Sequence, residues 1–176
     1  MAVDHVKSTP VTNLDASPVV ANTEGEGAAA YLMCVSSGDV VGVASSSVNA
    51  TYQFVRVPSN CKVKSILISS EAQGAGAFDF GIYYATDGLG NKPTALLAAN
   101  AINQALFAAA VSFASAVTQT EELINTFTPL MRNQPLWQAA GLASDPGGNF
   151  DIVGTVKTTA VTTGTGKMGV TVYYTN

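Results

Sequence analysis

Charged side chains are scarce in this sequence. They make up 11% of the 176 residues, against about 25% in typical soluble domains. Ser, Thr, Asn, Gln, Gly and Ala take their place. A surface with so little charge is a solubility risk for a free monomer. The composition therefore indicates either a surface that other subunits cover or a neutral polar surface like that of many secreted β-proteins, and it leaves both open.

Positive charge and histidine are scarcer still. The eight Lys and Arg residues are scattered without a cluster, and the net charge is −4, so direct binding to nucleic acid is not expected. The single histidine, His5, lies near the amino terminus. Catalysis by histidine requires a base whose surroundings fix its geometry. We therefore predict a non-enzymatic protein with no catalytic residue, cofactor or metal.

Only two cysteines are present, Cys34 and Cys61, in or beside apolar segments. Two cysteines do not make a secreted disulfide framework. Buried thiols are expected, and a single disulfide stays open.

Long apolar runs are also missing. The start of the chain lacks the charged residues and apolar core of a signal peptide. Residues 93–120 carry no charge, but Pro93, Asn100 and Ser112 interrupt them, and the run is rich in Ala rather than Leu or Ile. A membrane-spanning helix needs about 20 predominantly apolar residues, so no membrane span is expected.

Residues 78–84 carry the clearest pattern that is present. Phe78, Phe80, Ile82 and Tyr84 recur at every second position, which puts them on one face of a strand. The pattern predicts a half-buried strand of an antiparallel sheet with an aromatic face on a core. Asp79, at an intervening position, is expected to face solvent.

Further segments have the length and composition of strands, and together they predict an all-β antiparallel sandwich of about eight strands. The expected strands are 29–35, 40–44, 50–57, 62–70, 107–117, 150–156 and 168–174, in addition to 78–84. In the segment 50–57, simple alternation puts Tyr52, Phe54 and Arg56 on one face and Gln53, Val55 and Val57 on the other. Turns are expected at 36–39 and 145–148, and helices at 95–104, 123–127 and 135–141.

The first 28 residues differ from the rest, and we expect two parts, an arm (1–28) and a sandwich domain (29–176). The arm has no helical or alternating period, and residues 23–27 have the composition of a flexible joint. Small apolar residues nevertheless recur, which favours an extended arm that docks on a neighbouring subunit over an untethered terminus. The candidate partner-binding residues are Val3, Val6, Val11, Leu14, Val19 and Val20.

Other groupings have ordinary structural interpretations. Asp145, Asn149 and Asp151 could supply oxygen ligands to a calcium ion, but Asp145–Gly148 is turn sequence and Asp151 is expected to face solvent. Residues 164–167 lack the pattern of a phosphate loop and lead into a strand. Glu121 and Glu122 are interpreted as charges in the first turn of a helix. The aromatic residues could form a sugar-binding platform: Tyr31, Tyr52, Tyr83, Tyr84, Trp137, Tyr173 and Tyr174.

An ordered set of segments over residues 50–176 resembles a family of small virion structural proteins of tailed bacteriophages. The segments are Phe54–Pro58, Lys62–Ile68, Phe78–Tyr84 with Asp87-Gly88, Leu106-Phe107, Ala114–Val117, Pro135–Trp137, Gly141-Leu142, Asp145–Gly148, Phe150–Val153 and Val170–Thr175.

The resemblance implies a jelly-roll or related β-sandwich on the outer surface of a phage head, in a decoration or cement protein made in the host cytoplasm. It implies the major capsid protein and other copies of the chain as partners. The arm carries none of the matching segments. A tail, fibre or adaptor protein of the virion and a glycan-binding sandwich are the alternatives.

Overall fold

The computed structural model describes residues 5–17, 33–44, 46–74, 76–85, 101–123, 125–157 and 166–176. The elements of these residues are β1 (His5–Lys7), α1 (Thr9–Asp15), β2 (Cys34–Val41), β3 (Thr51–Pro58), β4 (Lys62–Ser70), β5 (Ala77–Tyr84), β6 (Ala101–Ser112), β7 (Val117–Glu122), the 3-10 helix η2 (Met131–Asn133), α2 (Leu136–Ala139), β8 (Asn149–Val156) and β9 (Lys167–Thr175).

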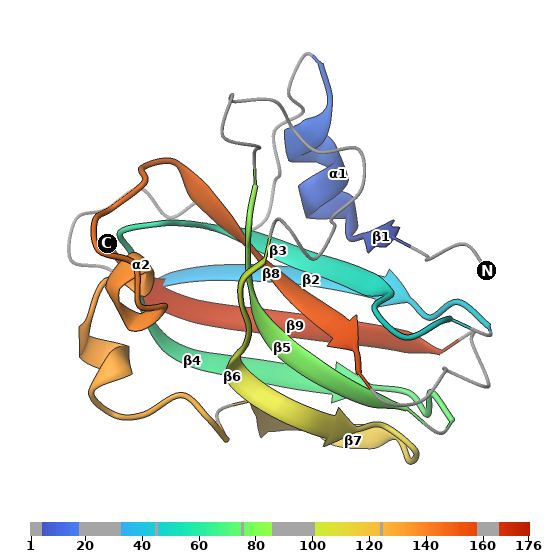
Figure 1. Cartoon of the computed structure of the whole chain (residues 1–176). Coiled ribbons are helices and arrows are strands. Elements are labelled where there is room, and N and C mark those ends of the chain that lie inside the picture. Colours follow the sequence, from blue (N-terminus) through green and yellow to red (C-terminus); the bar gives the residue numbers. More distant parts are fainter. Residues whose placement is uncertain are drawn as a thin grey trace.

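The strands form two packed sheets (Figure 1), in the orders β1-β3-β8-β5-β6 and β2-β9-β4-β7. The pairs β2–β9, β3–β8, β4–β7 and β5–β6 are all antiparallel. In the series from β2 to β9, the first strand therefore pairs with the last, the second with the second last, and so on inward. Successive pairs lie alternately in the two sheets. That arrangement is a jelly roll, and it confirms the predicted all-β sandwich. The parallel strand β1 and helix α1 are additions to it.

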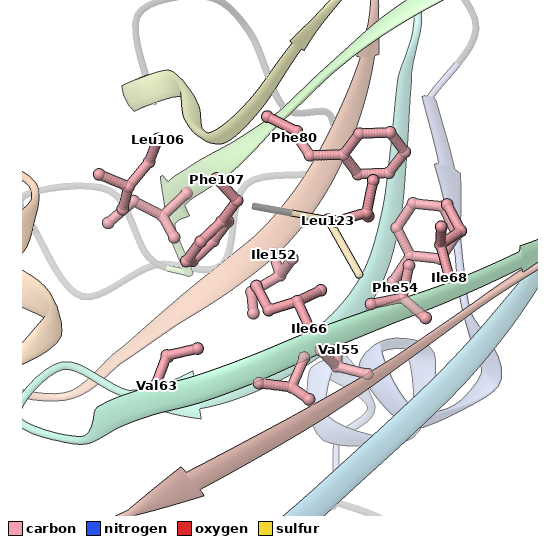
Figure 2. Close-up of a cluster of buried hydrophobic side chains, with 14 of the residues drawn as sticks. Phe54, Val55, Val63, Ile66, Ile68, Phe80, Leu106, Phe107, Leu123 and Ile152 are labelled. Carbon is pink, nitrogen blue, oxygen red and sulfur yellow. The ribbon is translucent and has the colours of Figure 1, made fainter. Parts of the chain in front are cut away.

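The inner faces of the two sheets share one hydrophobic core (Figure 2). Phe78, Phe80 and Ile82 are fully buried, as their alternation predicts. The ring of Phe80 packs on Phe54 of β3 and on Phe113, with centroids 6.0 and 5.9 Å apart. Aromatic rings bury large areas, so this cluster anchors the inner face of β5 in the core.

A β-bulge in β3 changes which residues face the core. Gln53 pairs with Val153 and Val55 with Ile152, so Phe54 is the extra residue. A bulge puts two residues opposite one, and the side-chain alternation reverses beyond it. Tyr52, Phe54, Val55 and Val57 are all fully buried in the core, whereas Arg56 lies beside Asp151. The prediction that Arg56 shares a face with Tyr52 and Phe54 is therefore wrong.

Strand β2 runs without a break through the predicted turn at 36–39. It pairs with β9 along its full length, from Cys34 to Val41. Residues 40–41 of the expected return strand (40–44) therefore continue the same strand, and 42–44 lie beyond its end. Gly38, which indicated a turn, serves a packing role instead. A Cβ at this position would lie closer than 3.0 Å to the carbonyl oxygen of Phe54, so only glycine lets β2 and β3 approach here. The expected start of this strand at 29–32 lies outside the described residues.

Two of the predicted helices, 95–104 and 123–127, are not helical where the structure describes them. Residues 101–104 belong to β6, while 95–100 lie outside the described residues, and 117–122 form β7 where a helix cap was expected. Leu123 donates its backbone N–H to Ile66 O of β4 at 2.8 Å, so the chain stays extended beside the sheet. Pairing with neighbouring strands outweighs the helix propensity of the Ala-rich segment. The predicted helical turns at 135–141 are confirmed by α2.

The outer edge of β6 is closed by side chains from the loop that follows β7. Asn125 donates to Ala109 O at 3.1 Å and accepts from Ala109 N at 2.9 Å, as a neighbouring strand would. Thr126 donates its hydroxyl to Ala105 O at 2.8 Å. Edge strands with unpaired backbone groups invite association with other chains, and these contacts occupy such groups on β6.

Candidate functional site

The candidate site is the surface on which the amino-terminal segment, residues 5–17, rests. Strand β1 extends the first sheet by pairing in parallel with β3, with His5, Val6 and Lys7 opposite Thr51, Tyr52 and Gln53. Helix α1 contacts both β3 and β2 (Figure 1). The segment therefore covers one edge of the sandwich where its two sheets meet. We call Gly38, Gln53, Phe54, Arg56 and Asp151 the docking site.

Ser8 forms the joint between β1 and α1 and is 1% exposed. Its backbone N–H donates to Gln53 O at 2.6 Å, and its hydroxyl donates to Phe54 O. Phe54 is the bulged residue, and the extra residue of a bulge is left out of the strand pairing, so its carbonyl can take this contact. Ser8 is also the N-cap of α1, because its hydroxyl accepts from Val11 N at 3.5 Å. One buried residue thus both starts the helix and fixes it to β3.

Four charged side chains link the segment to the sheet in an unbroken series. Lys7 pairs with Asp15 at 2.7 Å, and Asp15 pairs with Arg56 at 2.9 Å. Arg56 then donates to both carboxylate oxygens of Asp151, at 2.6 and 2.9 Å. The Arg56 and Asp151 side chains are 7% and 1% exposed. Buried charges are tolerated when they are paired and hydrogen-bonded, and this series contains two charges of each sign.

The pKa values of the series follow from burial and charge. Burial alone raises the pKa of Asp15, but the Lys7 hydrogen bond and the Arg56 charge outweigh it and leave the pKa below its ordinary value. Burial lowers the pKa of Arg56, but its two carboxylate partners raise it by more. Asp151 lies deeper, and its burial raises its pKa in spite of Arg56. Arg56 therefore stays charged. Its partner in the amino-terminal segment is the carboxylate of Asp15.

Burial on the outer face of this sheet extends from the docking site to Asp79, Tyr83 and Thr155. Asp79 is 4% exposed. It accepts from Ala110 N at 2.9 Å and pairs with Lys157 at 3.3 Å. Beside it, the Tyr83 and Thr155 hydroxyls lie 2.8 Å apart. The predictions that Asp79 and Asp151 face solvent are both wrong, because alternation shows which residues share a face but not whether something covers that face.

The structure describes three of the six predicted partner-binding residues. Val6 packs partly buried against the core, Val11 is 0% exposed, and Leu14 is half-buried. Val3, Val19 and Val20 lie outside the described residues. Residues 9–15 are helical, whereas the sequence predicts an extended arm. Ser8, with a proline in the first turn of the helix, was the sequence signal for this start. Arg56 and Asp151 were missed because their partners are distant in the sequence.

The remaining candidates have local structural partners. Asp145 accepts from Ser59 Oγ at 2.6 Å and from Gly147 N at 2.9 Å, so it stabilises its own turn. Glu122 pairs with Arg132 at 3.3 Å. Among the described residues no group of three or more His, Cys, Asp or Glu side chains is arranged to hold a metal ion.

Two of the candidate platform tyrosines and both cysteines are fully enclosed, while Tyr84, Trp137 and Tyr173 are half-buried and Tyr31 lies outside the described residues. Tyr52 and Tyr83 are fully buried, so their rings are not available to stack on a sugar. Cys34 and Cys61 are both buried, as expected, and the disulfide that the sequence left open is not formed. Burial, with a smaller effect of Cys34, raises the pKa of the Cys61 thiol to about 12. In the described part of the chain, neither helix has the length and apolar character needed to cross a membrane.

The fold is similar to that of a chain in a solved phage capsid. No family model matches the sequence, and no curated protein matches it. A chain from the capsid of Ralstonia phage GP4 superposes with a TM-score of 0.65 at 12% identity, over 97% of each chain. The likeness is one of fold. A chain from the capsid asymmetric unit of cyanophage Pam1 gives a TM-score of 0.46 at 15% identity, over 92% of this chain and 96% of that one.

Proposed function

We propose that this chain is a non-enzymatic structural protein of a bacteriophage virion, and that it decorates and stabilises the capsid from the outside. The observation that carries the proposal is the whole-chain likeness to a chain of the GP4 capsid. Both chains are covered almost completely, so the likeness is not limited to a sandwich core.

The surface composition supports the proposal. Charged residues make up only 11% of the chain, which suits a surface that is largely covered in an assembly. Large hydrophobic side chains are exposed at several separate positions, where contacts with neighbours can bury them. Within the described residues these are Met33, Val41, Val48 and Leu130.

The mechanism is burial of surface across seams between major capsid proteins and between copies of this chain. Each Å² of apolar surface removed from water contributes about 25 cal/mol. Small contacts repeated over a closed shell therefore resist internal pressure collectively. The amino-terminal arm adds to these contacts by reaching a neighbouring molecule.

Sedimentation of intact particles tests the proposal. Particles are pelleted in mild salt, and the chain is quantified in the pellet and in the supernatant. Recovery in the pellet at hundreds of copies per particle is expected for a shell protein. A handful of copies would favour a tail, fibre or adaptor location instead. Recovery only in the supernatant would show that the chain is not part of the virion.

A further inference from the structure

The docking site is held in shape without help from the segment that occupies it. Arg56 is oriented by two hydrogen bonds to Asp151 on the adjacent strand β8. Gln53 lies beside the same carboxylate, with its Nε2 3.5 Å from Asp151 Oδ2. All three side chains belong to β3 and β8, at the edge of the jelly roll. The guanidinium that receives Asp15 therefore keeps its position whichever molecule supplies Asp15.

The amino-terminal segment is likewise held together by its own contacts. Lys7 pairs with Asp15 across the joint between strand and helix. Ser8 caps the helix, and the Thr12 hydroxyl donates to Ser8 O at 2.9 Å. A short element with its own cap and ion pair has fewer conformations to lose on docking, which favours binding as a unit.

The contacts between the segment and the docking site fix the register of β1 on β3 and the position of the Asp15–Arg56 ion pair. The parallel pairing of Val6 with Tyr52 fixes the strand, and the contact of Asp15 with Arg56 fixes the far end of the helix. Val11, between them, is fully buried. Backbone pairing at a sheet edge, combined with a buried side chain and a charge pair, is how extended peptides are recognised by added-strand binding.

Residues 18–32 connect the segment to β2, and fifteen residues can span at most about 50 Å. A second copy whose docking site lies within this distance is in reach of the segment. We infer that the partner of the amino-terminal segment is a second copy of this chain, and that the segment exchanges between the equivalent docking sites of neighbouring copies. The same contacts form in both arrangements, so exchange links copies at little cost in contact energy.

This inference rests on the proposed function in one respect, because a shell holds many copies side by side and so raises the local concentration of competing segments. A second copy fits the site better than an unrelated protein. It carries the same Ser8, Val11 and Asp15 in the same spacing. Ser8 meets the Phe54 carbonyl, Asp15 meets Arg56, and Val11 is fully buried.

A disulfide between two differently labelled full-length variants tests the exchange. One variant carries Lys7→Cys and the other Gln53→Cys, which are directly opposed across the parallel pair, within the range that a disulfide bridges. The native Cys34 and Cys61 are buried. The two proteins are mixed, oxidised in concentrated solution and on particles, and run on a non-reducing gel. We expect a heterodimer that carries both labels.

A double variant with Lys7→Cys and Gln53→Cys in one chain shows that the link can form. A mixture of Lys7→Cys with Leu130→Cys is the control for random collision, since Leu130 is exposed in the loop before η2. A labelled heterodimer well above this control supports exchange. If the double variant closes within the chain and the mixture yields no more heterodimer than the control in either setting, exchange is overturned.

A second pair guards against poor folding of the Gln53 variant. Thr51→Cys is nearly the same size, and His5→Cys is its partner in the register. The two proposals fail separately. If the chain is absent from pelleted particles, the virion role is contradicted, and the experiment in solution still decides exchange. If particles retain the chain but no excess heterodimer forms in either setting, exchange alone is contradicted.

Discussion

Arg56 on β3 and Asp151 on β8 form a buried bidentate ion pair at adjacent positions of one sheet. The pair lies on the face opposite the hydrophobic core, and it is the inner end of the charge series that leads to Asp15 and Lys7. The β3 bulge at Phe54 makes it possible, because without that extra residue Arg56 would point into the core. The amino-terminal segment is thus held by charges whose placement depends on one irregularity in the sheet.

Removing the Arg56 guanidinium is expected to destabilise the protein severely. In Arg56→Gln, the carboxylate of Asp151 stays buried without its cation, and such losses cost about 3–5 kcal/mol. For a chain of this size each kcal/mol lowers the melting temperature by about 2–4 °C, which calorimetry detects. Lys157→Gln is the matched control, because Lys157 is half exposed and Asp79 keeps its bond from Ala110 N. Its cost is expected to stay below about 1 kcal/mol.

The double variant Arg56→Gln/Asp151→Asn separates this explanation from a general loss of packing. Removing both charges leaves no uncompensated buried charge, so the double variant is expected to be more stable than Arg56→Gln alone. A double variant that is no more stable than Arg56→Gln would contradict the ion-pair explanation.

The amino-terminal segment is expected to detach more easily at acid pH because of Asp15. Its folded-state pKa lies below the unfolded-state value. Its contribution to stability is therefore complete above the unfolded-state value, about 3.9, and is lost as the pH falls through the lower folded-state value. Asp151 acts in the opposite sense, because burial raises its pKa, whereas the carboxylate partners of Arg56 raise its pKa and keep it charged.

Comparison of Asp15→Asn with the unsubstituted chain isolates this effect. At neutral pH the substitution is expected to cost about 1.5–3 kcal/mol, the range for a hydrogen bond to a charged group. The difference in stability between the two proteins should shrink toward zero as the pH falls below about 4. Unfolding by urea at a series of pH values measures it, with Asp39→Asn at an exposed position of β2 as the control. A difference that does not change with pH would contradict the role of the Asp15 charge.

The presence of a strand could be predicted from the sequence wherever apolar residues recurred clearly at every second position or along the whole segment. Lys62–Ser70 is a strand over the predicted residues, and Ala77–Tyr84 and Asn149–Val156 differ from their predicted bounds by one residue at most. The jelly-roll order itself depends on pairings such as β2 with β9, which join residues far apart in the sequence. No local period reports these pairings, and the expectation of a jelly roll came from resemblance rather than from residue patterns.

The docking site was harder to predict for a physical reason. Its key contacts join Asp15 to Arg56 and Arg56 to Asp151, across 41 and 95 positions of sequence. The bulge that orients Arg56 leaves no mark in the composition of β3, since Gln53, Phe54 and Val55 are ordinary strand residues. The apolar residues of the segment were recognised, but whether they rest on the same chain or on another is not encoded in their spacing.

Gly38 is expected to be intolerant of any side chain. In Gly38→Ala, the new methyl group would meet the Phe54 carbonyl and lie 3.0 Å from Ser8 Oγ, so either β2 and β3 separate or the Ser8 contact is lost. Overpacking of this kind costs roughly 1–3 kcal/mol. Hydrogen exchange should then show faster exchange of Ser8 N–H, which donates to Gln53 O.

Gly169→Ala is the matched control for that substitution. Gly169 lies opposite Asp39 in β9, and its new methyl group would meet no atom closer than Ser69 Oγ at 3.3 Å. Alanine also restricts the unfolded chain, a gain of about 0.4–1 kcal/mol where the backbone allows it. Gly169→Ala is therefore expected to be close to neutral, and a similar loss in both variants would contradict the proposed contact between β2 and β3.

The two cysteines are expected to be unreactive in the folded protein. The thiolate is the reactive form, and burial raises the pKa of Cys61 to about 12, while Cys34 is 2% exposed. A thiol reagent at neutral pH should therefore modify neither residue until the chain is unfolded, when both should react at once. Val41→Cys supplies an exposed thiol on the strand that contains Cys34 and should react within seconds to minutes, as an ordinary thiol does. Rapid modification of the unsubstituted chain would mean that the core opens at the β2 edge, which would contradict the tight packing of β2 against β3 on which the docking site depends.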